Sequence, residues 1–265
     1  MIRFPRKLFP LLSLGVLLSA CAPVPEFYLA ENLSAKPFNQ LDLAGNACGP
    51  AALLNSSRFG NQDWRKISET PAGLSDRERI RSIARGPAMR ESSSLPGRAR
   101  WSRNGINLSD LKDVANELAY SEQLPRISEQ TLFLKANETQ RAHLHRVHSL
   151  LARSLAEGFP PIISIRRFVK RDGAWTAIQG HFVTITSVPG NISNDAEHFS
   201  IRYIDPLGGK FHDGRIAIHK KTFLGSDVVT NPNLEAIFPA AAVGKRFVGS
   251  SETSLLAVSA FIGRP

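Results

Sequence analysis

The sequence predicts an α+β fold, in which a helical half carrying Cys48 packs against an antiparallel sheet carrying His181 and Asp205. Two observations lead to this fold class. A predicted helix starts at Cys48 and another covers 137–157, whereas β-branched segments with alternating side chains, separated by turn residues, follow from residue 179. We expect a cleft between the two halves, because each half has an apolar face to bury against the other.

The chain begins with an export signal. Residues 1–7 are basic, and residues 8–20 form an apolar stretch that is too short to span a bilayer. Leu18-Ser-Ala-Cys21 has the form of a bacterial lipobox, which predicts cleavage before Cys21 and lipidation of its thiol. Secretion without lipid and an uncleaved anchor are the alternatives. Ala22 beside the lipidated residue resembles the sorting signal of Gram-negative outer-membrane lipoproteins, so we expect the protein in the cell envelope, at the outer membrane.

We divide the chain into a signal peptide (1–20), a lipidated tether (21–37) and one hydrolase domain (38–265), with no repeat and no second domain. Cleavage removes three basic residues, so the net charge falls from +10 to +7. A basic surface favours anionic partners such as lipid head groups or acidic polymers. The expected partners are a peptide or protein substrate and, through the lipid, the membrane; no motif indicates nucleic-acid binding, and the oligomeric state is not predicted.

Cys48 has the surroundings of a nucleophile. Good helix formers occupy positions 51–55, and Gly49-Pro50 suits the first turn of a helix, so Cys48 lies at its positive end. Helix amides and the helix dipole favour the thiolate there. Gln40, eight positions upstream, is placed to present its amide beside the Cys48 N–H and complete an oxyanion hole. The alternative is a buried structural cysteine beside a solvent-facing glutamine.

A base and its orienting acid are predicted on two neighbouring strands. Residues 179–188 alternate with His181 on the apolar face, and residues 199–205 alternate with Asp205 on the face of the other apolar residues. Turn residues fill 189–196. A hairpin symmetric about Ser193 makes His181 and Asp205 direct cross-strand neighbours, since 181 and 205 sum to 386. Alternatively, His181 is an ordinary core residue and Asp205 a turn former. Three further short strands are expected at 215–218, 234–238 and 255–262.

Two other features have a functional and a structural interpretation. The arginine-rich segment Arg77–Arg103 reads as a helix followed by a flexible basic loop, which is either a lid that recruits an anionic substrate or a solvated insertion. Three histidines, His143, His145 and His148, fall in a helix over 137–157. Zinc is conceivable there, but no third ligand has a fitting spacing, so an exposed helix face is the better interpretation. We therefore predict no metal and no cofactor.

Several motifs together resemble the cysteine peptidases that process bacteriocin leaders, a family with a papain-like fold. The resemblance covers about residues 38–211. It is carried by Phe38-Asn39-Gln40, by 46–53 around Cys48, by 105–111, by 155–165, by Gly180-His181-Phe182-Val183 and by 203–209 around Asp205. The match implies that Cys48 is the nucleophile, His181 the base, Asp205 the orienter and Gln40 an oxyanion donor. The loop between the last two motifs and the segment 59–104 are longer than in the family pattern.

The resemblance implies a membrane-tethered cysteine hydrolase of the peptidase type. Two alternatives stay open. An acyltransferase would use the same thioester and pass the acyl group to an amine or alcohol, and a non-catalytic envelope-binding lipoprotein would keep a vestigial triad. The sequence does not identify the substrate.

Overall fold

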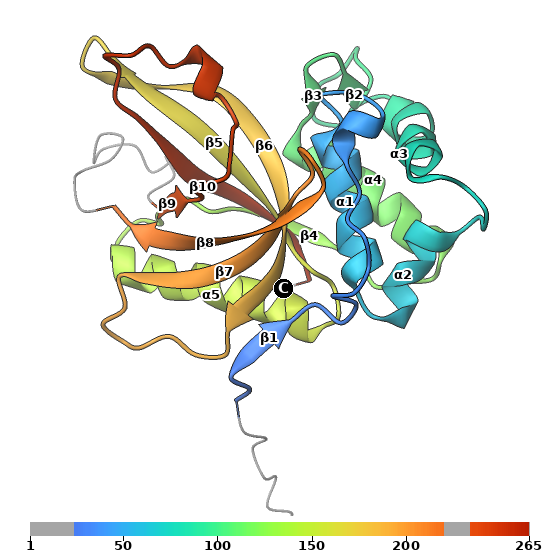
Figure 1. The fold of residues 1–265 in the computed structure, drawn as a ribbon, viewed down its shortest axis with the longest axis horizontal. Coiled ribbons are helices and arrows are strands. Elements are labelled where there is room, and N and C mark those ends of the chain that lie inside the picture. Colours follow the sequence, from blue (N-terminus) through green and yellow to red (C-terminus); the bar gives the residue numbers. More distant parts are fainter. Residues whose placement is uncertain (1–23, 220–233, 265) are drawn as a thin grey trace, which may run out of the picture.

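The structure is a computed structural model that describes residues 24–219 and 234–264 (Figure 1). The predicted export signal and Cys21 lie outside the described residues. The helices are α1 (Cys48–Phe59), α2 (Gln62–Glu69), α3 (Asp76–Arg85), α4 (Leu108–Ser121) and α5 (Gln140–Ala156), with short 3-10 turns η1 (Gln40–Asp42), η2 (Pro87–Met89) and η3 (Lys245–Phe247). The strands are β1 (Phe27–Leu29), β2 (Trp101–Ser102), β3 (Gly105–Ile106), β4 (Ser128–Thr131), β5 (Ile162–Arg171), β6 (Ala174–Pro189), β7 (His198–Asp205), β8 (Lys210–Ile218), β9 (Leu234–Ile237) and β10 (Ser254–Gly263).

The main sheet closes on itself. Its strands pair antiparallel in the order β6, β5, β10, β9, β8, β7, and β7 pairs back onto β6. The result is a closed six-stranded antiparallel barrel, with β1 added to β6 and β4 added to β10. The papain-like fold, with a helical half packed on a sheet, is therefore wrong as the fold class. Alternation in the sequence indicates a half-buried strand. It does not indicate whether the first and last strands of a sheet pair with each other to close a barrel.

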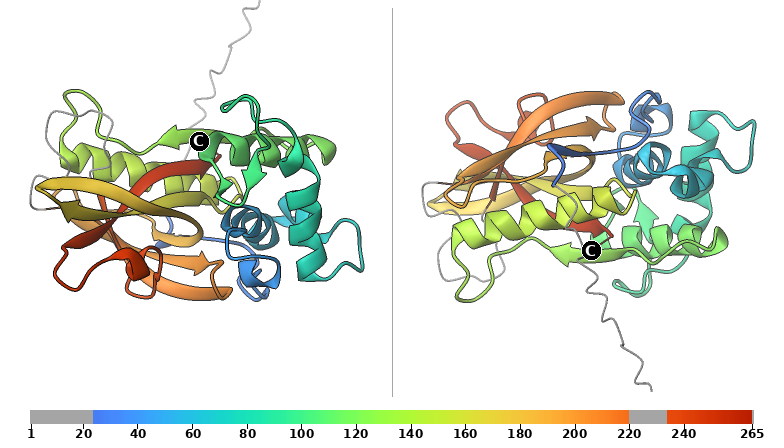
Figure 2. Two further views of the ribbon diagram at one scale, coloured as in Figure 1. Left: turned by 90° about the horizontal axis from the view of Figure 1, so that it is seen from above. Right: turned by 90° about the horizontal axis from the view of Figure 1, so that it is seen from below.

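Two apolar cores lie on the two sides of the barrel wall. The first combines inward residues of the barrel strands with the apolar stripe of α5, including Leu144, Val147 and Leu151. The second lies between the barrel and helices α1–α4, and Phe182 of β6 belongs to it. Figure 1 shows α1–α4 grouped beside the barrel, and the two views of Figure 2 show α5 lying along it. β6 is buried between the two cores over 181–186, polar positions included.

Most of the individual elements follow the sequence pattern. A helix begins at Cys48, a helix occupies 140–156, and strands cover the five segments expected around and after His181. Within the expected tether, residues 27–29 instead form β1, which pairs with 187–189 of β6, and Ala30 is buried. The ordered domain thus includes part of 21–37.

Among the residues that the structure describes, no helix is both long and apolar enough to cross a membrane.

Candidate active site

Cys48 is the first residue of α1, at the helix end where backbone N–H groups have no partner within the helix. Gly49 follows because a side chain does not fit there: a Cβ would lie 2.3 Å from Cγ2 of Ile106 in β3. The β2–β3 hairpin is fastened to the start of the helix by two hydrogen bonds. Asn46 Nδ2 donates to the Ser102 carbonyl at 2.8 Å, and Trp101 Nε1 donates to the Asn46 carbonyl at 3.3 Å. The predicted helix start is confirmed, and Cys48 is partly exposed at it.

The structure brings Cys48, His181 and Asp205 into one hydrogen-bonded line. His181 Nε2 lies 2.8 Å from Asp205 Oδ1, and the His181 side chain also hydrogen-bonds the Cys48 thiol. Since Nε2 faces the carboxylate, Nδ1 is the ring atom left for the sulfur. His181 and Asp205 are buried, whereas Cys48 retains some exposure. The order of groups is nucleophile, base and orienting acid.

The register that predicted the His181–Asp205 contact is wrong, although the contact exists. β6 and β7 pair Thr184 with Ile204 and Ile185 with Tyr203, so paired positions sum to 388 rather than 386. Beyond Ile185, on the side away from His181, an irregularity shifts the pairing by one more residue, so that Ser187 pairs with Arg202. His181 and Asp205 are consequently diagonal neighbours on one face, which long side chains can still bridge.

The electrostatics of the pair favour a thiolate and an imidazolium. Burial opposes ionisation of Cys48, but hydrogen bonds from His181, the charge of His181 and the N–H groups of Phe182 and Gly49 outweigh it and lower the Cys48 pKa. Burial also opposes a charged His181, yet hydrogen bonds to Asp205 and Cys48, together with their charges, raise the His181 pKa to about 9. Proton transfer from sulfur to imidazole is favoured by both shifts.

The Phe182 backbone N–H is a thiolate donor that the sequence pattern does not predict. The last β6–β7 pair is Thr184 with Ile204, so β7 leaves β6 just before Phe182 is reached. Cys48 approaches β6 there and accepts from the Phe182 N–H. A backbone donor has no sequence signal, and only the position of the helix start against the strand reveals it.

Gln40 lies in η1, in the loop that leads to Cys48. Its side chain is buried, and Nε2 donates to the Gly45 carbonyl at 2.6 Å. A primary amide has two N–H donors, so one remains for another acceptor. Oε1 has no hydrogen-bond partner among the described residues. The expectation of a solvent-facing glutamine, the alternative to an oxyanion donor, does not fit this burial.

Two of the three histidines of α5, His143 and His148, do not lie on an exposed face, whereas His145 is partly exposed. His143 is fully buried and His148 nearly so, and His148 Nε2 hydrogen-bonds the Pro189 carbonyl at 2.7 Å. The apolar stripe of α5 is wide enough to include both positions, because the helix packs against the barrel core. Within residues 24–219 and 234–264, no group of three His, Cys, Asp or Glu side chains is arranged to hold a metal ion.

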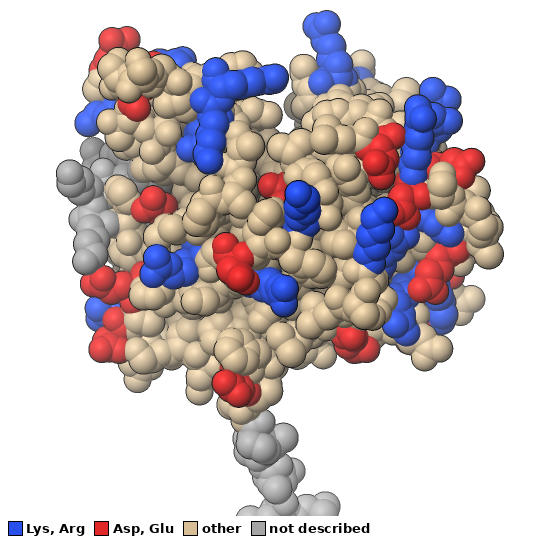
Figure 3. Space-filling model, viewed as in Figure 1, with Lys and Arg blue, Asp and Glu red and all other residues tan. Residues whose placement is uncertain are grey.

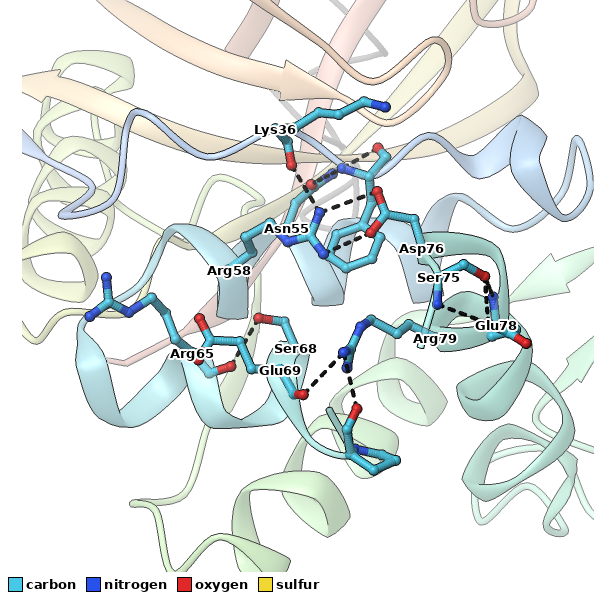
Figure 4. Close-up of polar contacts among 12 residues, drawn as sticks. Lys36, Asn55, Arg58, Arg65, Ser68, Glu69, Ser75, Asp76, Glu78 and Arg79 are labelled. Carbon is cyan, nitrogen blue, oxygen red and sulfur yellow. Dashed lines mark hydrogen bonds and ion pairs between the residues drawn. The ribbon is translucent and has the colours of Figure 1, made fainter. Parts of the chain in front are cut away.

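The arginine-rich segment 77–103 is held against its neighbours rather than free. Arg79 is buried and donates to the carbonyls of Glu69 and Pro71 at 3.0 Å, as Figure 4 shows. Arg100 is also buried and forms an ion pair with Glu117 of α4 at 2.8 Å. On the face shown in Figure 3, lysines and arginines over the helical side alternate with acidic residues. The segment follows the expected order, with α3 over 76–85 and an exposed loop at 93–98, and part of its basic charge has a structural use.

Comparisons of the chain with family models, curated proteins and solved structures found no match.

Proposed function

We propose that the protein is a cysteine hydrolase of the peptidase type, anchored to the outer membrane through a lipid on Cys21. The observation that supports catalysis is the hydrogen-bonded line from the Cys48 thiol through His181 to Asp205, with the thiol at a helix start. A structural cysteine needs neither a buried imidazole nor a carboxylate behind it.

In the proposed reaction, the Cys48 thiolate attacks the carbonyl carbon of a peptide bond, and a C–S bond forms while the carbonyl oxygen becomes an oxyanion. The free first-turn N–H groups of α1 and the remaining N–H of Gln40 stabilise that oxygen. The His181 imidazolium gives its proton to the amine as the C–N bond breaks. Water then attacks the thioester, His181 accepts its proton, and the acid and the free thiol are released.

Asp205 serves as the orienter of His181 in this scheme. Its Oδ1 accepts from His181 Nε2 and also from the Leu207 N–H, each at 2.8 Å. The backbone bond fixes the carboxylate independently of the histidine. His181 therefore presents Nδ1 to the sulfur through both halves of the reaction.

The active site lies at the end of α1 opposite to the segment that follows β1, near the start of the described residues. Asn32, just after β1, donates through Nδ2 to the Arg58 carbonyl at 2.9 Å, near the last residue of α1. Arg58 follows Cys48 by ten residues, so the two positions lie about 15 Å apart along the helix. This arrangement supports a substrate that arrives from the aqueous side rather than from the bilayer to which Cys21 would be anchored.

The experiment uses 4-nitrophenyl acetate as an acyl donor, because it needs no knowledge of the natural substrate. We expect a burst of nitrophenolate and an acetyl adduct on Cys48, and Cys48→Ala should lose both while keeping the wild-type melting temperature. Ser57→Ala, elsewhere on α1, is the matched control and should react like the wild type. A burst of the same size in Cys48→Ala would remove the proposal.

The same experiment separates the alternatives. If added amines divert the acetyl group from water, the protein is an acyltransferase. If Cys48 is neither acylated nor alkylated faster than a free thiol, it is a binding protein with an inactive triad.

A further inference from the structure

The segment just before the nucleophile is fastened to α1, the helix that carries Cys48. Asn55 is fully buried, accepts from the Phe38 N–H at 2.7 Å and donates to the Phe38 carbonyl at 3.3 Å. Asn55 lies seven residues after Cys48, about two helical turns along the same face. The Arg58 guanidinium also covers the Phe38 ring, at 3.5 Å from its centroid, and pairs with Asp76 at 2.8 Å. Figure 4 shows Asn55, Arg58 and Asp76 around this segment.

The next two residues are fastened to the turn that follows Asp205. The Gln40 N–H donates to the Pro206 carbonyl at 2.8 Å. Asn39 Oδ1 accepts from the Gly208 N–H at 3.0 Å and from the Leu41 N–H at 3.1 Å. Its second bond caps η1, the turn that contains Gln40. A single oxygen atom thus joins the acid turn to the turn of the oxyanion donor.

The close approach at this point depends on glycine. Gly208 and Gly209 have φ values of 100° and 59°, the left-handed region that other residues rarely adopt. A Cβ on Gly209 would lie 3.1 Å from the Asn39 Cβ and 3.2 Å from the Phe38 carbonyl oxygen. The turn after Asp205 is therefore shaped to lie against residues 38 and 39.

We propose that Asn39 is a positioning residue, which fixes the Gln40 amide relative to the triad by joining η1 to the 206–209 turn. This inference rests on the proposed function, because it assigns a role within the same site. Asn39 itself contacts no reacting atom. Without its oxygen, η1 loses its cap and one of its two bonds to the turn, so that only the Gln40 N–H bond to the Pro206 carbonyl still joins them. The Gln40 amide is then held less firmly in its direction.

The proposed role of Asn39 should affect two reactions of Cys48 differently. Acylation by 4-nitrophenyl acetate forms a C–S bond, creates an oxyanion and expels nitrophenolate, so it depends on the oxyanion donors. Alkylation by iodoacetamide forms a C–S bond and expels iodide, and no oxyanion develops. Asp205 keeps its own bond to the Leu207 N–H, so the thiolate should survive a change at Asn39.

The experiment measures both rates in the full chain and in three variants. Asn39→Ala should slow acylation by about tenfold to a hundredfold and leave alkylation within about twofold of wild type, as expected for a misplaced donor. Asn39→Asp keeps the accepting oxygen and should restore acylation. Asn61→Ala is the matched control, since Asn61 Oδ1 likewise caps a helix, α2, by accepting from Asp63 and Trp64, away from Cys48.

Two results overturn the inference. The first is acylation by Asn39→Ala within about twofold of wild type. The second is an equal loss of acylation and alkylation in Asn39→Ala, which shows a general loss of structure, combined with an acylation rate in Asn39→Asp that does not recover although the accepting oxygen is kept. A wild-type protein that alkylates slowly and does not acylate overturns the proposed function itself, and is recognised without any variant.

Discussion

Replacing Asp205 by Asn tests the link between the buried carboxylate and the charge of His181. Asn keeps the size of the side chain and an oxygen that can accept from the Leu207 N–H, which holds Asp205 at 2.8 Å. It removes the negative charge that faces His181 Nε2. Only the electrostatic support of the imidazolium is lost.

The size of the effect follows from the pKa of His181. That pKa is raised from 6.5 to about 9, despite burial that opposes the charge, by hydrogen bonds to Asp205 and Cys48 and by their charges. A difference of 2.5 corresponds to about 3 kcal/mol in favour of the imidazolium. Since the Asp205 hydrogen bond is the largest of the favourable causes, we expect the His181 pKa to fall by at least about one unit, or about 1.4 kcal/mol. As the pH rises, His181 would then lose its proton at a lower pH than in the wild type, and the Cys48 pKa would rise because its partner is less charged.

The assay is histidine NMR on uniformly 13C-labelled protein, titrated from pH 5 to pH 10. The signal of His181 is identified by its absence in His181→Gln, and the melting temperature of Asp205→Asn reports whether the fold is kept. A His181 pKa in Asp205→Asn that stays within about 0.3 of the wild-type value would refute the electrostatic role of Asp205.

Three further substitutions, at Asn55, His143 and Gly49, test the roles of buried positions. Asn55→Ala should lower the free energy of unfolding by about 2–4 kcal/mol in urea titrations, because the Phe38 N–H and carbonyl both lose a buried partner; a cost below about 1 kcal/mol contradicts this. Burial lowers the His143 pKa to about 4, so between pH 4 and 6.5 the unfolded chain binds more protons than the folded chain. The free energy of unfolding therefore falls as the pH drops through that range, by about 3 kcal/mol in all. His143→Met should flatten this part of the pH dependence of urea midpoints, and an unchanged slope means that other groups cause it. Gly49→Ala should cost about 1–3 kcal/mol through its contact with Ile106, and the cost should shrink in the Ile106→Ala background; equal costs in both backgrounds exclude this contact as the cause.

The sequence predicts local elements well where periodicity and end signals agree. α1 begins at Cys48, where Gly49-Pro50 marks a first turn, and β7 ends at Asp205, before Pro206. Closure of the barrel was not predictable in this way. It depends on β10 pairing with β5, about 90 residues earlier, and on β6 pairing with both β5 and β7. Those pairings depend on contacts between distant strands, which no local pattern reports.

The candidate site, too, was predictable in its residues but not in its strand register. The residue types and their order along the chain predict Cys48, His181 and Asp205, and the structure brings these three together. Their register was wrong by two, because the hairpin is centred later in the chain than Ser193, the centre that the turn residues suggested. The buried state of His143 was also missed, because a histidine beside an apolar stripe can lie on either side of its boundary.

The central claim is that Cys48 and His181 form a thiolate–imidazolium pair. The most direct measurement is the pH dependence of Cys48 alkylation by iodoacetamide, in wild type and in His181→Ala, with the chain starting at residue 22. The account predicts a wild-type thiolate that titrates well below the reference pKa of about 8.5, and an upward shift of that pKa in His181→Ala. An ordinary thiol pKa that is the same in both proteins would contradict it.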